Sequence, residues 1–431
     1  MKPSRPRIAI TGLGLVTPVG NDARTTWANL QAGHSGLGSI EHFDASGFPV
    51  RIGAAVKNFD AAAVIKNSRL LKHATRAHRF ALAAAEEALT DAGIRPENAT
   101  AERWGFSVGA GMMGVDWREL EATQKIIAPD GEFQPRRLLA PEFPADPIAF
   151  SRSQSNAGLA LLTEHFGIRG YATAVHTACA SGGQALGTAL KMLRRGQSDF
   201  VLAGGFDSML NPVGLSAFCL LGALSPDNET PTRASRPFDA TRNGFVLGEG
   251  AGFLVLEKWD AAVKRGANIY AEFAGDGNSL SCYRITDSPP DGDGPIQAMR
   301  QALADAGVTP AELDYVNAHG TSTKMNDQSE CAALRAVLGG EVSRVAISST
   351  KSGMGHLIAA AGAVEAAICA LAIRDGIVPV NANFSQRDPA CDVNLVLEKS
   401  RPQKIRAALS NSLGFGGSNS CLVFRNPEVV G

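Results

Sequence analysis

One cysteine stands where the sequence changes from a strand-like to a helix-like pattern. Cys179 lies in AVHTACASGGQALGTAL (174–190), between a short β-like run and an Ala/Gly-rich helical run. The first turn of a helix offers free N–H groups and partial positive charge, and both favour a thiolate over a thiol. Because the thiolate is the nucleophilic form, this position predicts a catalytic cysteine. The alternative is a buried structural cysteine among small residues.

Two histidines occur further along the chain, in turns of similar composition. His319 lies in NAHGTST (317–323) and His356 follows STKSGMG (349–355), each after a strand-like run. One thiol and two imidazoles suit nucleophilic catalysis. A zinc site is the alternative, but neither HExxH nor CxxC spacing is present, so we expect no metal.

A glycine-rich segment near the C-terminal end surrounds one aromatic residue. Phe415 is flanked by Gly414, Gly416 and Gly417 in LSNSLGFGGSNSCLVF (409–424). Glycine lets such a loop move with little steric penalty. The segment is either a plain hairpin turn with one exposed ring, or a backbone N–H donor and an aromatic gate at a pocket.

Strand-like and helix-like runs alternate along the whole chain, which predicts an α/β fold with buried sheets. The strand-like runs include RIAITGLG, WGFSVGAG, FVLAGGFDSM, AGFLVLE, IYAEFAGDG, YVNAHG and VAISST. The helix-like runs include ALAAAEEALTDAGI, GGQALGTALKMLRRG, IQAMRQALADAGV and SECAALRAVLGG. Residues 175–190 and 347–362 are faintly similar, which indicates either chance or two duplicated halves whose corresponding turns face each other.

The composition excludes several classes of protein. The 431 residues are 45% hydrophobic and 19% charged, and the net charge of −1 creates no global attraction for nucleic acid. Seven scattered cysteines without a CxxC pair indicate reduced thiols and a cytoplasmic protein. The apolar segment 357–373 is shorter than a membrane span and contains Glu365, so we expect a buried helix.

Taken together, these segments resemble the elongating β-ketoacyl-acyl carrier protein synthases of the thiolase-like superfamily. The resemblance covers almost the whole chain. The motifs that carry it are AITGLGLVTPVG, TACASG, SRPFDATRNGFVLGEGAGFLVLE, NAHGTST, STKSGMGHLIAAAGAVEA and NSLGFGGSN. It implies a five-layered αβαβα sandwich of two similar halves. We place Cys179 in an N-terminal half (1–260) and both histidines in a C-terminal half (261–431).

The resemblance also implies a reaction and roles for its residues. Cys179 accepts the acyl group, and His319 and His356 complete a Cys-His-His triad. Lys351 matches the family's lysine, and Glu365 lies at the helix position that pairs with it. The backbone N–H groups of Cys179 and Phe415 form the oxyanion hole, and the Phe415 ring is the gate. The implied reaction is a decarboxylative Claisen condensation with a malonyl-carrier, with no metal, nucleotide or flavin cofactor.

The implied partners are an acyl carrier protein and a second subunit. Carrier proteins are acidic, so docking needs a basic face. Arg136 and Arg137 match a basic pair beside the family's entrance, and the segment 66–76 adds Lys66, Arg69, Lys72 and Arg76. The dimer is either a homodimer or a heterodimer with a chain-length-factor-like subunit, and in the second case this chain is the active half.

Four positions depart from the family's usual pattern. They are Leu413 instead of phenylalanine, Asn243 instead of an acidic residue, Lys324 instead of proline, and His176 just before the catalytic turn. The departures leave two pathways open, fatty-acid synthesis and a specialised polyketide or polyene pathway. A thiolase relative is a further alternative, but thiolases usually have a second catalytic cysteine where His356 stands.

Overall fold

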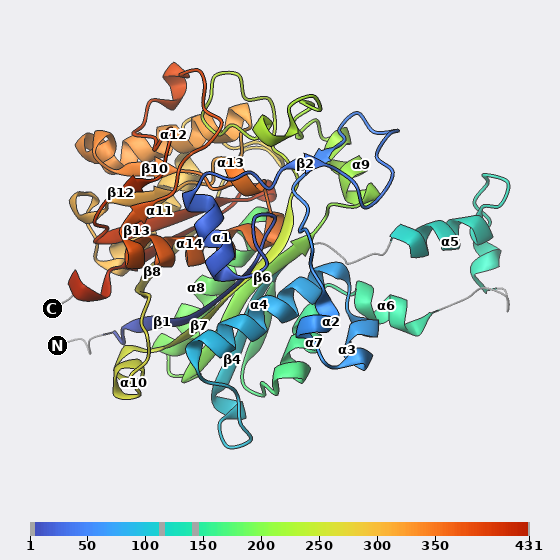
Figure 1. Cartoon of the computed structure of the whole chain (residues 1–431), viewed down its shortest axis with the longest axis horizontal. Helices are drawn as coiled ribbons and strands as arrows, with labels where there is room; N and C mark the ends of the chain where they lie inside the picture. The colour runs from blue at the N-terminus through green and yellow to red at the C-terminus, as the bar shows by residue number, and fades with distance from the viewer. Residues whose placement is uncertain (1–4, 112–116, 140–145, 430–431) are drawn as a thin grey trace.

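The computed structural model describes residues 5–111, 117–139 and 146–429. Ten of the described strands join into one sheet in the order β10-β9-β13-β14-β8-β1-β7-β6-β4-β5 (Figure 1). The N-terminal set contains β1 (Ile8–Val16), β4 (Trp104–Ala110), β5 (Ala172–Val175), β6 (Phe200–Ser208) and β7 (Glu249–Lys258). The C-terminal set contains β8 (Ala271–Leu280), β9 (Tyr315–Asn317), β10 (Ala346–Ser348), β13 (Ala407–Leu413) and β14 (Ser418–Arg425).

The two sets of strands have the same topology. In each set the first strand pairs with the fifth and the fifth with the fourth, both antiparallel. The fourth then pairs with the second and the second with the third, both parallel. A short antiparallel pairing of β1 with β8, Ala9 to Glu272 and Ile10 to Ala271, joins the two sets.

Helices cover both outer faces and fill the space between the two sets of strands. α4 (Arg76–Ala92) and α7 (Ala157–Phe166) pack outside the N-terminal set, and α11 (Asp293–Ala306) and α12 (Lys324–Leu338) lie on the C-terminal side. α8 (Ser181–Arg194) and α14 (Ala361–Asp375) pack against each other in the middle. The expected five-layered αβαβα sandwich of two similar halves is therefore confirmed.

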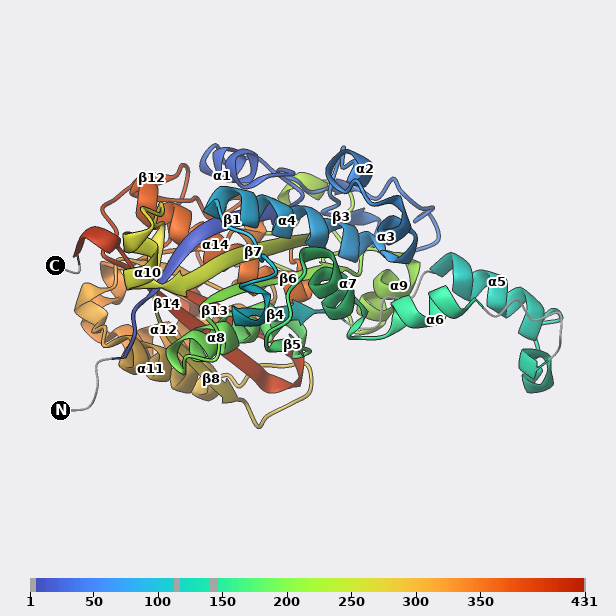
Figure 2. The same ribbon diagram turned by 90° about the horizontal axis from the view of Figure 1, so that it is seen from below.

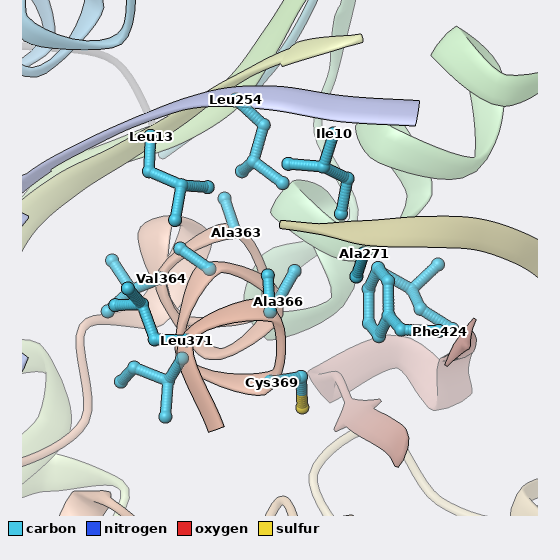
Figure 3. Close-up of a cluster of buried hydrophobic side chains, with 14 of the residues drawn as sticks. Ile10, Leu13, Leu254, Ala271, Ala363, Val364, Ala366, Cys369, Leu371 and Phe424 are labelled. Atoms are coloured by element: carbon cyan, nitrogen blue, oxygen red, sulfur yellow. The ribbon is translucent and has the colours of Figure 1, made fainter. Parts of the chain in front are cut away.

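α14 is the core helix that the apolar segment predicted. Every residue from Ala361 to Ile373 is buried. Figure 3 shows its side chains between Leu13 and Leu254 of the N-terminal strands and Phe424 of β14. Among the described residues, no helix combines the length and apolar character that a membrane crossing requires.

Glycines bring α8 and α14 into close contact. A Cβ atom on Gly182 would lie 2.8 Å from the carbonyl oxygen of Ala359, and one on Gly362 would lie 2.7 Å from the amide nitrogen of Gly183. Cβ contacts this short essentially do not occur. The small residues after Cys179 therefore allow the central helices to meet where their first turns lie.

Three short helical segments extend from one side of the sandwich, and we call them the arm. They are α5 (Trp117–Ile127), η2 (Pro135–Leu139) and α6 (Pro147–Ser153), and Figures 1 and 2 both show the arm projecting from one side. None of their described residues is buried. Arg152 of α6 forms an ion pair with Glu119 of α5 and donates a hydrogen bond of 3.3 Å to the carbonyl of Lys72.

The remaining helices and strands are short and lie around the sandwich. They are α1 (Ala23–Gln31), α2 (Ala61–Val64), α3 (Ser68–His73), α9 (Pro212–Leu220), α10 (Trp259–Lys264), α13 (Lys351–Met354), β2 (Gly38–Ser39), β3 (Ile52–Gly53), β11 (Ile377–Val378) and β12 (Arg401–Pro402).

Candidate active site

Cys179 lies in a tight turn, η3 (Ala178–Ala180), directly before α8. Ala178 has a left-handed backbone with φ of 50°, which is uncommon for a residue with a Cβ atom. Ser181 holds the turn, because its Oγ accepts the Thr177 N–H at 2.8 Å and donates to the Ala178 carbonyl at 2.7 Å. The predicted position of the cysteine between a strand and a helix is thus observed.

The thiol is almost fully buried, with 5% of its residue surface exposed. Burial raises the pKa of Cys179 to about 12, although the charge of Lys351 and the backbone N–H groups of Phe415 and Cys179 lower it. The backbone N–H groups favour the thiolate, as expected, but desolvation outweighs them. A base must therefore remove the proton during attack.

His319 and His356 lie beside the thiol. The Sγ atom of Cys179 and one ring nitrogen of each histidine all lie within 4.8 Å of one another, and all three residues are buried. The two imidazole centroids are 5.1 Å apart and the rings are nearly perpendicular, at 83°. Burial and the nearby Lys351 charge hold the pKa of each histidine well below its usual value, so both rings are neutral at pH 7.

Hydrogen bonding fixes the tautomer of His356. The backbone N–H of Ile358 donates to Nδ1 of His356 at 3.3 Å, so the proton of the neutral ring resides on Nε2. This Nε2 is buried and has no hydrogen-bond partner among the described residues. It is a donor ready for a substrate oxygen. A protonated Nε2 and the adjacent Lys351 charge both disfavour a metal cation at this cluster.

Glu330 holds the loop that carries His319. Its carboxylate accepts the backbone N–H groups of His319 and Gly320, both at 2.8 Å, and the Asn411 amide at 3.1 Å. The sequence analysis did not assign this role, because the partner groups belong to the backbone.

Lys351 and Glu365 form a fully buried ion pair between α13 and α14. Burial raises the pKa of Glu365 to about 7, although Lys351 lowers it. Lys351 also lowers the pKa values of the Cys179 thiol and of both imidazoles. The lysine is therefore the charge that the three triad residues share.

A cavity of about 420 Å³ opens onto the triad, and its wall includes Cys179, His319, His356 and Phe415. Three of the four departures from the family pattern, Leu413, Asn243 and Lys324, also line it. The fourth, His176, is exposed and its Nδ1 lies 3.1 Å from the carbonyl oxygen of Ala110.

Phe415 begins the short turn η9 (Phe415–Gly417) and is half-buried. The neighbouring Gly414 approaches the nucleophile turn so closely that a Cβ there would lie 2.7 Å from the Thr177 carbonyl oxygen. Gly416 has φ of 80°, which favours glycine. The backbone N–H of Phe415 reaches the Cys179 thiol and lowers its pKa.

The basic residues expected to bind a carrier occupy two separate places. Arg136 and Arg137 are exposed on η2 of the arm, and Lys66, Arg69 and Lys72 are exposed around α2 and α3. Arg76 differs, because its guanidinium binds the fully buried Glu249 at 2.6 Å. Arg76 is therefore paired with a buried acid, although its own side chain remains 43% exposed.

One buried acid beside the triad was missed by the sequence analysis. Asp207, near the end of β6, is 3% exposed and its charge acts on the Cys179 thiol. Burial raises the pKa of its carboxyl to about 7. Its position at a strand end was the only available signal in the sequence.

The fold and this site define a thiolase-like condensing enzyme class, and comparisons with known proteins agree. Models of the β-ketoacyl synthase N-terminal and C-terminal domains match residues 5–262 and 270–385. The chain therefore belongs to the β-ketoacyl synthase family.

Curated relatives cover nearly the whole chain. The 3-oxoacyl-[acyl-carrier-protein] synthase 2 of Coxiella burnetii is 38% identical over 97% of this chain and 98% of its own length. The enzyme of the same name from Vibrio harveyi is 39% identical over 98% and 99%.

Solved structures are similar as well. A type II PKS ketosynthase in complex with its acyl-carrier protein has 33% identity and a TM-score of 0.86, covering 98% of this chain and 100% of its own. The ishigamide ketosynthase/chain length factor has 33% identity and a TM-score of 0.88, with the same coverage.

Proposed function

We propose that this protein is a β-ketoacyl-acyl carrier protein synthase that condenses a cysteine-bound acyl group with malonyl-carrier. The observation that carries the proposal is the cluster of Cys179, His319 and His356 within 4.8 Å at the wall of a cavity. The names of the curated relatives and of the similar structures support it.

The first half-reaction loads the nucleophile. An imidazole takes the Cys179 proton as Sγ attacks the thioester carbonyl, because the buried thiol is protonated at rest. The oxyanion that forms accepts hydrogen bonds from the backbone N–H groups of Cys179 and Phe415. Preorganised donors of this kind stabilise such an oxyanion strongly. The tetrahedral intermediate then expels the carrier thiolate, which takes up a proton and leaves as a thiol.

The second half-reaction forms the new carbon–carbon bond. Malonyl-carrier loses carbon dioxide, and the electron pair of the broken bond becomes an enolate on the thioester. The Nε2–H of His356 and the ring of His319 stabilise the enolate oxygen. The enolate carbon attacks acyl-Cys179, and the released thiolate regains a proton.

In this proposal the acyl carrier protein docks on exposed basic residues. They are Arg136 and Arg137 on the arm, and Lys66, Arg69 and Lys72 beside it. An acidic partner gains association rate from such a surface. The hydrogen bond from Arg152 to the carbonyl of Lys72 supports a common docking face, because it tethers the arm to α3.

The working unit of this proposal is a dimer. The arm exposes Leu139 at 89% and Phe150 at 72%, and the loop between α5 and η2 exposes Phe133 at 61%. Exposed apolar groups of this kind mark interaction surfaces. β5 is the last strand at one end of the described sheet and leaves one strand edge without a neighbouring strand. We place the enzyme in the cytoplasm, which agrees with its seven free cysteines. We place the boundary between the two halves of the chain at residue 260.

The second candidate is the active subunit of a heterodimer with a chain-length-factor-like partner, in a polyketide or polyene pathway. The similar ketosynthase/chain length factor structure favours it. Light scattering of the purified chain distinguishes the two, since a homodimer forms alone and a heterodimeric subunit needs its coexpressed partner.

Intact-mass analysis tests the function directly. After incubation with acyl-carrier, the enzyme should gain one acyl mass, mapped to Cys179 among seven cysteines. Malonyl-carrier should then discharge it and yield a β-ketoacyl-carrier. Acylation of another cysteine while Cys179 stays free would contradict the assignment, and Cys179→Ser should nearly abolish condensation.

A further inference from the structure

The C-terminal half contains a turn that matches the nucleophile turn residue for residue. η7 (Ile358–Ala360) precedes α14 as η3 precedes α8, so Ala359 occupies the place that corresponds to Cys179. Both turns pack together and both begin with a left-handed residue, with φ of 50° at Ala178 and 48° at Ile358. A β-branched residue is a genuine outlier there, so its surroundings must hold it in place.

Asp207 supplies that restraint. Its Oδ2 accepts the backbone N–H of Ala359 at 3.2 Å. Two glycines allow the approach: a Cβ on Gly111 would lie 2.4 Å from Asp207 Oδ2, and one on Gly205 would lie 2.7 Å from the Ala359 carbonyl oxygen. The acid therefore fixes the peptide that follows Ile358.

The peptide that precedes Ile358 is the one that contacts the catalytic histidine. Its N–H donates to Nδ1 of His356 and leaves the Nε2 proton facing the cavity. The two peptides share the φ and ψ angles of Ile358, so a change at Ala359 alters the direction of the N–H that reaches His356.

We propose that Asp207 is a positioning residue for decarboxylation, which holds the Ile358–Ala360 turn and thereby keeps the Nε2–H of His356 aimed at the enolate oxygen. The proposal rests on the condensation proposed above. The charge of Asp207 also raises the pKa of Cys179, and the charge of Glu249 raises the pKa of Asp207. The test must therefore separate the hydrogen bond of Asp207 from its charge.

Three variants make that separation. Asp207→Leu removes the acceptor at similar size, and Asp207→Asn keeps an acceptor without charge. Asp276→Leu is the matched control, because Asp276 is also buried, binds Lys191 at 2.7 Å and lies outside the site. For each variant, carbon dioxide release from malonyl-carrier and acylation of Cys179 are measured separately.

Asp207→Leu should slow decarboxylation about 10- to 100-fold more than acylation, which is the scale of a misplaced catalytic group. Asp207→Asn should keep decarboxylation within about threefold of wild type, because a neutral acceptor retains the bond. Asp276→Leu should change both rates equally. Equal losses in Asp207→Leu, or an Asn variant as impaired as the Leu variant, would overturn the proposal.

Hydrogen exchange gives a second readout if Asp207→Leu does not fold. In Asp207→Ala, amides of residues 355–362 should exchange faster while those of residues 174–182 remain unchanged. A uniform change, or none, overturns the proposal. A wild-type enzyme that releases no carbon dioxide from malonyl-carrier would instead contradict the proposed function, and the exchange experiment would still decide the role of Asp207.

Discussion

At the scale of single residues, the tautomer of His356 makes a specific prediction about its substitutions. His356→Ala removes the Nε2–H donor, and loss of one such donor costs on the order of 10²–10³ in rate. His356→Gln keeps an N–H donor and should retain more decarboxylation than the alanine variant. Carbon dioxide release measures the effect, and Cys179 acylation should fall less in both. Decarboxylation at the wild-type rate in His356→Ala would refute the role.

The buried thiol makes a prediction about pH. A pKa raised to about 12 means that Cys179 is protonated at neutral pH and that its thiolate fraction grows as pH rises. Iodoacetamide labelling of Cys179, followed by peptide mapping, should therefore speed up about tenfold per pH unit from 7 to 10, without a plateau. Lys351→Met should slow the labelling further, because it removes a charge that lowers this pKa. A plateau below pH 9 would show that desolvation is not dominant.

At the scale of elements, the contact between α8 and α14 depends on glycine. In Gly182→Ala the new methyl group would meet the Ala359 carbonyl, a backbone atom that cannot move alone. We expect a loss of about 1–3 kcal/mol in the free energy of unfolding, as in other overpacked cores. Urea denaturation measures it, with Gly47→Ala as the control, since no atom lies within 4 Å of a Cβ there. Equal stability of the two variants would show that the central helices can separate without cost.

The end of β13 makes a prediction about substrate choice. Leu413 lines the cavity beside Phe415 and is smaller than the phenylalanine common in the family. Leu413→Phe should reduce transfer of polyunsaturated acyl groups more than saturated ones of equal length, roughly several-fold for a change of a few methylene-sized volumes. Competing transfer rates of the two substrates give the ratio. If the ratio does not change, acyl selection occurs elsewhere in the cavity or at a partner subunit.

The sequence predicted most of the sandwich because its buried strands and helices show either an apolar period or a continuous apolar run. The run WGFSVGAG matches β4, and ALAAAEEALTDAGI matches the end of α4, where Gly93 adopts the left-handed conformation of a helix stop. The arm was not predicted, because none of the described residues of α5 and α6 is buried, so packing against the core does not fix where these helices lie.

The candidate site was predictable where side chains carry the chemistry. Cys179, His319 and His356 occupy turns of small residues, and these turns are visible in the sequence. Asp207 and Glu330 were not assignable, because they act on backbone N–H groups, which residue types in a sequence do not identify. The protonation of Cys179 was not predictable either, since desolvation depends on tertiary packing.

At the scale of the whole molecule, the proposed mechanism draws on residues of both halves. The nucleophile belongs to the N-terminal half, whereas both imidazoles and the Lys351–Glu365 pair belong to the C-terminal half. The matching turn of the C-terminal half has alanine in place of the cysteine. Neither half alone contains the groups for condensation, so the halves must keep one fixed arrangement.

The short pairing of β1 with β8 has a thermodynamic consequence for that arrangement. It makes one continuous ladder of ten strands, and α8 and α14 are buried against strands of both sets. Unfolding of either half would remove the strand that pairs with the other half and one side of the packing around α8 and α14. Scanning calorimetry should therefore record one endotherm. Its calorimetric enthalpy should equal its van't Hoff enthalpy, because the two halves unfold as one cooperative unit. Two resolved endotherms would mean that the halves melt independently.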